Sequence, residues 1–194
     1  MSDYSQQINK YLDLLKNTID NLDRAEISKL IDLFIDAREN GRNIFVMGNG
    51  GSASAASHMV CDFNKGVSYG QEKRFKIICL NDSLSTVRAY ANDVGYEIAF
   101  VEQLKNFLTP NDLVLAISGS GNSKNIVLAI DYANSVGATT IGITGYHGGK
   151  LKQMAKYSVN ANVDDMQVSE DIHMILNHLV MKILYLANGQ QPSC

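Results

Sequence analysis

The chain has 194 residues, of which 45% are hydrophobic and 19% charged, a composition that suits one globular domain with a full-sized core. Its net charge of -3 argues against a general nucleic-acid binder, because such a protein needs a basic surface to displace counterions from phosphates. No apolar run approaches the roughly 20 residues of a membrane span, and the first residues lack the pattern of a signal peptide. We therefore expect a cytoplasmic protein that binds neither nucleic acid nor membrane.

Two amphipathic helices are predicted at the N-terminus. Apolar residues recur at helical spacing from Ile8 to Ile19 and again from Ile27 to Phe34. Asn40-Gly41 is a typical end for the second helix. We expect residues 1–41 to form this helical segment and residues 42–194 to form an α/β core, both within a single domain.

From residue 43 onward, short apolar runs rich in β-forming residues alternate with helical stretches. The expected strands are 43–47, 75–80, 113–117, 139–143 and 157–161. The expected helices are 53–64, 83–92, 95–107, 122–136 and 167–187. This alternation predicts βα units and a mostly parallel, buried sheet. The predicted fold class is therefore α/β, a three-layer α/β/α sandwich with a mostly parallel five-stranded sheet and additional N-terminal helices.

Two of the predicted strands end in loops of glycine and serine. The first loop reads Gly48-Asn49-Gly50-Gly51-Ser52, and the second reads Ser118-Gly119-Ser120-Gly121-Asn122-Ser123. In a parallel sheet, ligands bind at this edge, where helix N-termini present free N–H groups. Glycine lets the backbone approach an anion closely, and serine hydroxyls add uncharged donors. One such loop is typical of an ordinary turn, but two together predict a phosphate-binding cradle. Neither loop is a nucleotide-binding signature.

Histidines and carboxylates recur at helical spacing on two predicted helices. His58 and Asp62 are four residues apart, so they share one face of the helix that follows the first loop. Glu170 and His178 lie in one row on the terminal helix, with Asp171 as an alternative carboxylate. Such a set is suited to a divalent metal such as zinc, and equally to a base and an acid for proton transfer. Spacing alone leaves both interpretations open.

The order and spacing of these motifs resemble the sugar isomerase (SIS) domain, specifically the sedoheptulose-7-phosphate isomerase (phosphoheptose isomerase) family. The resemblance covers nearly the whole chain. It is carried by the two loops, Asn92-Asp93-Val94-Gly95, Thr144-Gly145, Gly148-Gly149 and Glu170-Asp171-Ile172-His173 with His178. It implies a flavodoxin-like fold and a cytoplasmic homotetramer with active sites between subunits, which the N-terminal helices help to assemble.

The resemblance also implies an enzyme, an intramolecular oxidoreductase that converts sedoheptulose 7-phosphate to glycero-manno-heptose 7-phosphate through an enediol. The implied substrate-binding residues are Asn49, Gly50, Gly51, Ser52, Asn92, Asp93, Ser118, Gly119, Ser120, Ser123 and Glu170. The implied metal is zinc, held by His58, Asp62, Glu170 and His178. Asp62 is the expected catalytic base and His178 the expected general acid.

The sequence departs from the family pattern at two positions. Asp62 stands where the family has its catalytic glutamate, and Glu170 stands where the family has a glutamine ligand. The first change shortens a side chain by one methylene, and the second adds a negative charge. Glu170 as the base, with Asp62 on the metal, is therefore an alternative mechanism. The alternative functions are an isomerase of a different phosphosugar and a non-catalytic SIS sugar-phosphate sensor or regulatory protein.

Overall fold

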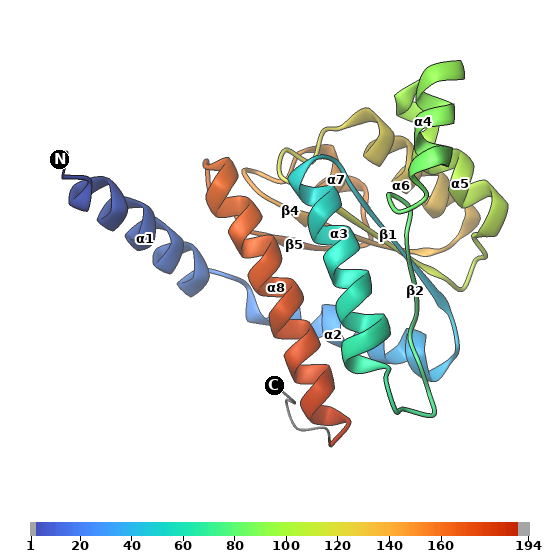
Figure 1. Cartoon of the computed structure of the whole chain (residues 1–194), viewed down its shortest axis with the longest axis horizontal. Helices are drawn as coiled ribbons and strands as arrows, with labels where there is room; N and C mark the ends of the chain where they lie inside the picture. The colour runs from blue at the N-terminus through green and yellow to red at the C-terminus, as the bar shows by residue number, and fades with distance from the viewer. Residues whose placement is uncertain (1–2, 190–194) are drawn as a thin grey trace.

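The computed structural model describes residues 3–189 and contains one five-stranded parallel sheet (Figure 1). The strands are β1 (Asn43–Gly48), β2 (Lys76–Cys79), β3 (Leu113–Ser118), β4 (Thr139–Thr144) and β5 (Tyr157–Asn160). Their order in the sheet is β2-β1-β3-β4-β5, the flavodoxin-like order of a doubly wound sheet. The predicted α/β fold class is confirmed.

The switch in strand order falls between β1 and β3. From β1 the chain crosses to β2 on one side and then returns to β3 on the other side. Open α/β sheets bind ligands at such a switch point, beyond the carboxyl ends of the strands. In the register of the sheet Gly48 lies beside Ile117, so both glycine-serine loops leave the sheet at neighbouring points of one edge.

Helices cover both faces of the sheet. They are α1 (Ser5–Asp20), α2 (Arg24–Glu39), α3 (Gly51–Cys61), α4 (Leu84–Asp93), α5 (Ala99–Phe107), α6 (Lys124–Val136), α7 (Gly149–Met154) and α8 (Met166–Ala187). One core packs α2, α3 and α8 against the sheet, and the other packs α5, α6 and α7 against its opposite face. Helix α1 projects from this body, beside α8 (Figure 1).

The two cores use alternate residues of each strand. On β1, Ile44 and Val46 face the core with α3 and α8, whereas Phe45 and Met47 face the core with α5 and α6. Successive side chains of a strand point to opposite faces. A strand buried on both faces therefore reads as one continuous apolar run.

The helix boundaries differ from the predicted ones at three places. The helix expected at 53–64 begins at Gly51 and continues after Cys61 as a π-helix, η1 (Asp62–Val67). The helix expected at 95–107 consists of a 3-10 turn, η2 (Tyr96–Ile98), followed by α5. Helix α7 was not predicted, because six residues are too few to show a helical period. The π-helix η1 was not predicted, because such segments are rare and have no apolar period of their own. Short π-helical segments are frequent at functional sites.

Within residues 3–189, none of the helices combines the length and the apolar character that crossing a membrane requires.

Candidate active site

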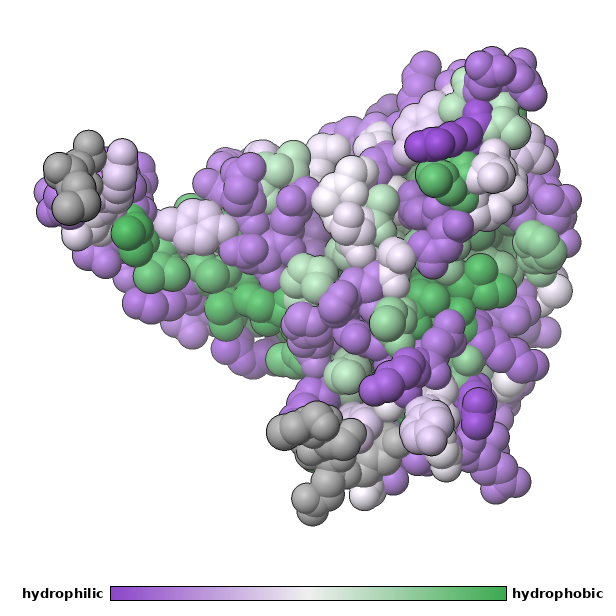
Figure 2. Space-filling view, in the orientation of Figure 1, coloured by the Kyte–Doolittle hydropathy of each residue, from purple (hydrophilic) through white to green (hydrophobic). Residues whose placement is uncertain are grey.

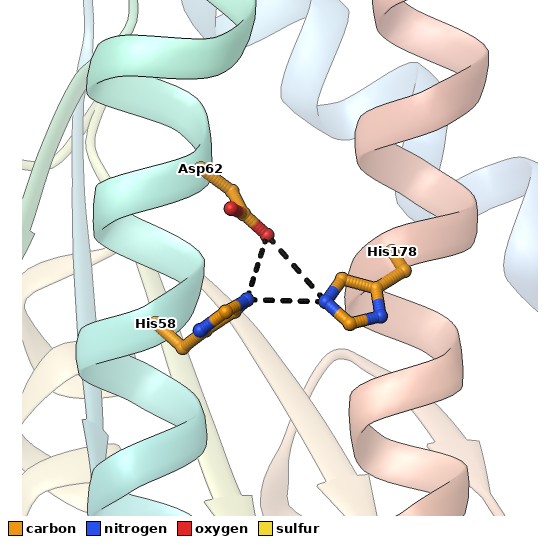
Figure 3. Close-up of side chains that lie close together, drawn as sticks. All are labelled: His58, Asp62 and His178. Atoms are coloured by element: carbon orange, nitrogen blue, oxygen red, sulfur yellow. Dashed lines mark hydrogen bonds and ion pairs between the residues drawn. The ribbon is translucent and has the colours of Figure 1, made fainter. Parts of the chain in front are cut away.

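Three side chains from α3, η1 and α8 meet between these helices (Figure 3). The Nε2 atoms of His58 and His178 are 3.1 Å apart. Asp62 Oδ2 lies 3.3 Å from His58 Nε2 and 3.9 Å from His178 Nε2. The Asp62 side chain is 17% exposed and the two imidazoles are about half exposed, so the group is open to a ligand.

The spacing of these three atoms fits a divalent metal. Ligands bonded at about 2.0–2.1 Å to a tetrahedral ion stand about 3.3 Å apart, close to the distances between the atoms of this group. Imidazole nitrogen and carboxylate oxygen are also ligands that zinc accepts. Three protein ligands leave a coordination position free, which is the arrangement of a catalytic rather than a structural site.

Helix geometry brings the three side chains together. His58 and Asp62 are one turn apart where α3 passes into η1, and they face His178 across the space between α3 and α8. The Asp165 carboxylate caps α8 by accepting from the Val168 N–H. Three of the four implied metal ligands, His58, Asp62 and His178, thus lie close together within a single chain.

The glycine and serine loops line a cavity next to this group, and we call this cavity the cradle. Its walls are Asn49, Gly50, Gly51, Ser52, Ser118, Gly119, Ser120, Ser123, Met166 and Glu170. Helices α3 and α6 both begin here, and neither N-cap residue, Gly50 or Ser123, makes a side-chain cap hydrogen bond among the described residues. The free N–H groups and the positive ends of the two helix dipoles favour an anion. The Ser118 hydroxyl accepts from the Gly121 N–H at 3.1 Å and keeps its own hydrogen for a ligand.

Glu170 lies between the cradle and the histidines. A Cβ at Gly51 would come within 2.5 Å of Glu170 Oε1, so the carboxylate lies directly against the backbone of the first loop. Glu170 lines the cradle and also a neighbouring cavity that includes His58 and Met174. It is not part of the three-residue group. The carboxylate of Asp171 instead accepts a hydrogen bond from Tyr11 on α1 at 2.6 Å.

The side chain of Asn49 is braced by its neighbours. Asn49 and Asn125 exchange two amide hydrogen bonds of 2.9 Å, and the Tyr96 hydroxyl donates to Asn49 Oδ1 at 2.7 Å. The Asn49 carbonyl is therefore occupied, and this residue can offer a ligand only its remaining amide hydrogen and its backbone. Asn125 and Tyr96 were not singled out from the sequence, because a contact between the first loop and residues of α6 and η2 has no local pattern.

The second loop is supported by the turn that precedes α7. Gly145 donates its N–H to the Gly119 carbonyl, and Leu151 donates to the Gly121 carbonyl, both at 2.9 Å. A Cβ at Gly121 would collide with the backbone of Gly148. The glycine-rich turn after β4 thus supports the serine loop.

Asn92 and Asp93 lie apart from the cradle. They end α4, are exposed and are hydrogen-bonded to each other, with Asn92 Nδ2 donating to Asp93 Oδ1 at 2.7 Å. Neither lines the cradle or the cavity beside His58 within the described part of the chain.

His173 is a buried histidine close to the site. It is 1% exposed, and neither ring nitrogen has a hydrogen bond of good geometry among residues 3–189. Burial lowers the pKa of its imidazole to about 4, although the nearby backbone of Thr144 opposes the shift. The ring is therefore neutral at pH 7.

This burial predicts acid sensitivity of the fold. Unfolded His173 takes up a proton near pH 6.5 and the folded residue only near pH 4. Between these values the unfolded chain binds more protons, so stability is lost as the pH falls. We expect His173 to remove about 2 kcal/mol of unfolding free energy between pH 7 and pH 5. Urea unfolding of the parent and of His173→Leu at both pH values measures this; an equal pH dependence would contradict it.

Comparison with known proteins shows the family to which this fold belongs. The SIS domain family matches residues 3–145. Over 175 residues the chain is 33% identical to a probable phosphoheptose isomerase of Thermoplasma acidophilum, covering 90% of this chain and 96% of that one. Over 166 residues it is 32% identical to a phosphoheptose isomerase of Helicobacter pylori, covering 86% and 85%. A phosphoheptose isomerase structure from Francisella tularensis shares the fold, with a TM-score of 0.83, 24% identity and coverage of 94% and 98%.

A doubly wound sheet with two serine loops at its switch point, together with the family match, defines a SIS-domain protein. The sequence identity to two phosphoheptose isomerases, over most of both chains, shows which family within this class the chain belongs to. The chain belongs to the phosphoheptose isomerase family, as the motifs in its sequence predicted.

Proposed function

We propose that this protein is an aldose–ketose isomerase that interconverts sedoheptulose 7-phosphate and glycero-manno-heptose 7-phosphate. The observation that carries the proposal is the meeting of His58, Asp62 and His178 beside the serine-lined cradle. Membership of the phosphoheptose isomerase family supports the same reaction. A pure sensor of sugar phosphates would need the cradle but not the acid and histidine group.

The cradle is the proposed phosphate site. Serine hydroxyls and free N–H groups at the starts of α3 and α6 would bind the phosphate of the sugar. No lysine or arginine lines this cavity within the described residues, so the binding would depend on hydroxyls, backbone N–H groups and helix dipoles. The proposed phosphate contacts are Ser52, Ser118, Ser120 and Ser123, with Asn49, Gly50, Gly51 and Gly119 beside them. The contacts of Asn92 and Asp93 with the sugar are implied by the family resemblance alone, because neither residue lines these cavities in the described part of the chain.

Proton transfer is assigned to the carboxylate and an imidazole. Isomerisation moves a proton between C1 and C2 through an enediol, which requires a base at carbon and an acid at the neighbouring oxygen. Asp62 is the proposed base because its Oδ2 faces the open space between the imidazoles. His178 is the proposed acid at the sugar oxygen, in the state in which its Nε2 carries a proton and not a metal. Glu170, between the cradle and His58, is the alternative base.

The proposed cofactor is zinc, held by His58, Asp62 and His178 with Glu170 as a further ligand. The spacing of the first three donor atoms supports this assignment. When bound, the ion would act as a Lewis acid on the sugar carbonyl. A carboxylate that binds the metal strongly is a weaker base. With two carboxylates near the site, one can bind the metal while the other acts as the base.

The proposed assembly is a cytoplasmic homotetramer with active sites between subunits. Residues 1–41 would provide contacts between subunits, and residues 42–194 would form the catalytic core. Helix α1 projects from the body and exposes Ile8 and Leu12. Figure 2 shows apolar surface along this helix. Sedimentation of the full chain and of a chain lacking residues 1–20 measures the oligomeric state.

The proposed reaction is tested by incubation with sedoheptulose 7-phosphate, with and without a chelator. We expect an aldose product without chelator, and its loss after metal removal with recovery on adding zinc. Binding without turnover under all conditions would favour the sensor function. Turnover of another ketose phosphate alone would indicate a different substrate.

A cradle mutation should affect binding more than chemistry. For Ser120→Ala we expect KM to rise about tenfold with kcat nearly unchanged, because a phosphate contact is made equally in ground and transition states. Ser135→Ala is a matched control, since that hydroxyl lies on the surface of α6 and donates only to the Tyr132 carbonyl. An unchanged KM for Ser120→Ala would place the phosphate elsewhere.

A further inference from the structure

A buried amide on α8 contacts the carboxylate at the centre of the proposed site. Asn177 directly precedes His178 and is 1% exposed. Its Nδ2 donates to Asp62 Oδ2 at 3.0 Å. The same oxygen lies nearest to both imidazoles. One buried donor and two more exposed ring nitrogens therefore share a single carboxylate oxygen.

The orientation of this amide is fixed by chemistry. An ionised carboxylate only accepts hydrogen bonds, so Asn177 must present its Nδ2 to Asp62. Its Oδ1 is then left buried without a hydrogen-bond partner among the described residues. Buried amide oxygens are normally paired. An apolar side chain would avoid this unpaired oxygen, which indicates that the contact with Asp62 is the role of the amide.

Asp62 depends on this contact for its direction. It is the first residue of the π-helix η1, and its other described partners are His58 and His178. Whether a neutral imidazole nitrogen donates or accepts depends on its tautomer, and binding a metal removes it as a donor. The Asn177 amide is a donor in every state of the site.

We propose that Asn177 is a positioning residue, which holds Asp62 Oδ2 toward the two histidines. This inference rests on the proposed function, because it assigns a role within that catalytic site. Carboxylates that bind metals are themselves held by hydrogen bonds from surrounding residues. The same restraint would keep a catalytic base directed at the substrate carbon. Asn177 acts through Asp62 and does not touch the substrate.

The first test is Asn177→Leu, a substitution of similar size without the donor. We expect kcat to fall about 10- to 100-fold, with KM changed less than about twofold because the cradle is intact. We expect the melting temperature to stay the same or rise, because the unpaired amide oxygen is removed. A merely structural residue would lower stability and activity together. Asn177→Ala, which also lacks the donor, should show the same kinetic pattern.

Leu176→Met is the matched control for packing. Leu176 is the adjacent residue of α8 and is equally buried, but it carries no polar group. Its kcat, KM and melting temperature should remain close to those of the parent. An equal loss of kcat in Leu176→Met and Asn177→Leu would assign the effect to packing and overturn the proposal.

The second test measures zinc affinity by chelator competition in the absence of substrate. Asn177→Leu should weaken zinc binding about 10- to 100-fold when Asp62 is present, and less than about threefold in an Asp62→Ala background. Equal losses in both backgrounds, or no loss in either, would overturn the proposed positioning role. No zinc binding by the parent chain would instead contradict the zinc assignment, and the kinetic test then decides the role of Asn177.

Discussion

Asp62→Asn should abolish isomerisation while leaving sugar-phosphate binding largely intact. The substitution keeps the size of the side chain and can still accept the Asn177 hydrogen bond, so the fold should be preserved. It removes the negative charge that takes the proton from carbon. Loss of a positioned general base typically lowers the rate about 10²- to 10⁴-fold. Turnover and calorimetric binding of sedoheptulose 7-phosphate measure the two parts of the prediction.

Glu170→Gln is the matched comparison, because it neutralises the second carboxylate at the site. If Asp62 is the base, Glu170→Gln should retain measurable turnover. Full activity in Asp62→Asn, with loss of activity in Glu170→Gln, would assign the base to Glu170 instead. The pair of variants therefore decides which of the two carboxylates takes the proton.

His178→Gln should produce the second large loss of activity. It removes the proposed acid and one of the two nitrogens that face each other at 3.1 Å. We expect kcat to fall about 10²- to 10⁴-fold and zinc affinity to fall with it. His147→Gln is a suitable control, because the His147 side chain is 85% exposed and its Nε2 lies 3.8 Å from Asp164 Oδ1, outside the site. Parental kcat in His178→Gln would remove this residue from the mechanism.

Much of the fold could be predicted from local patterns. The three central strands, β1, β3 and β4, are buried on both faces, so they read as continuous apolar runs. The predicted bounds of all five strands lie within one residue of the observed ones. The π-helix from Asp62 was missed because its hydrogen bonds change spacing without changing the apolar pattern. The six residues of α7 were missed because they complete less than two turns.

The site could be predicted only in part, because several of its contacts join residues that are far apart in sequence. His58 and Asp62 share a helix, so their proximity follows from a spacing of four residues. Their meeting with His178 depends on how α3 packs against α8, which was expected from the family resemblance and not from spacing. The contacts made by Asn177 and Asn125 join residues 115 and 76 positions apart in sequence. No local signal marks such pairs, apart from an amide on the mostly apolar buried face of α8.

A crystal structure of the protein soaked with zinc and sedoheptulose 7-phosphate would examine the arrangement most directly. The expected result is anomalous density for a metal touching the imidazoles of α3 and α8, with the ester group of the sugar seated among the hydroxyls at the carboxyl ends of β1 and β3. Density for the sugar at another surface, or for the metal away from Asp62, would contradict the account.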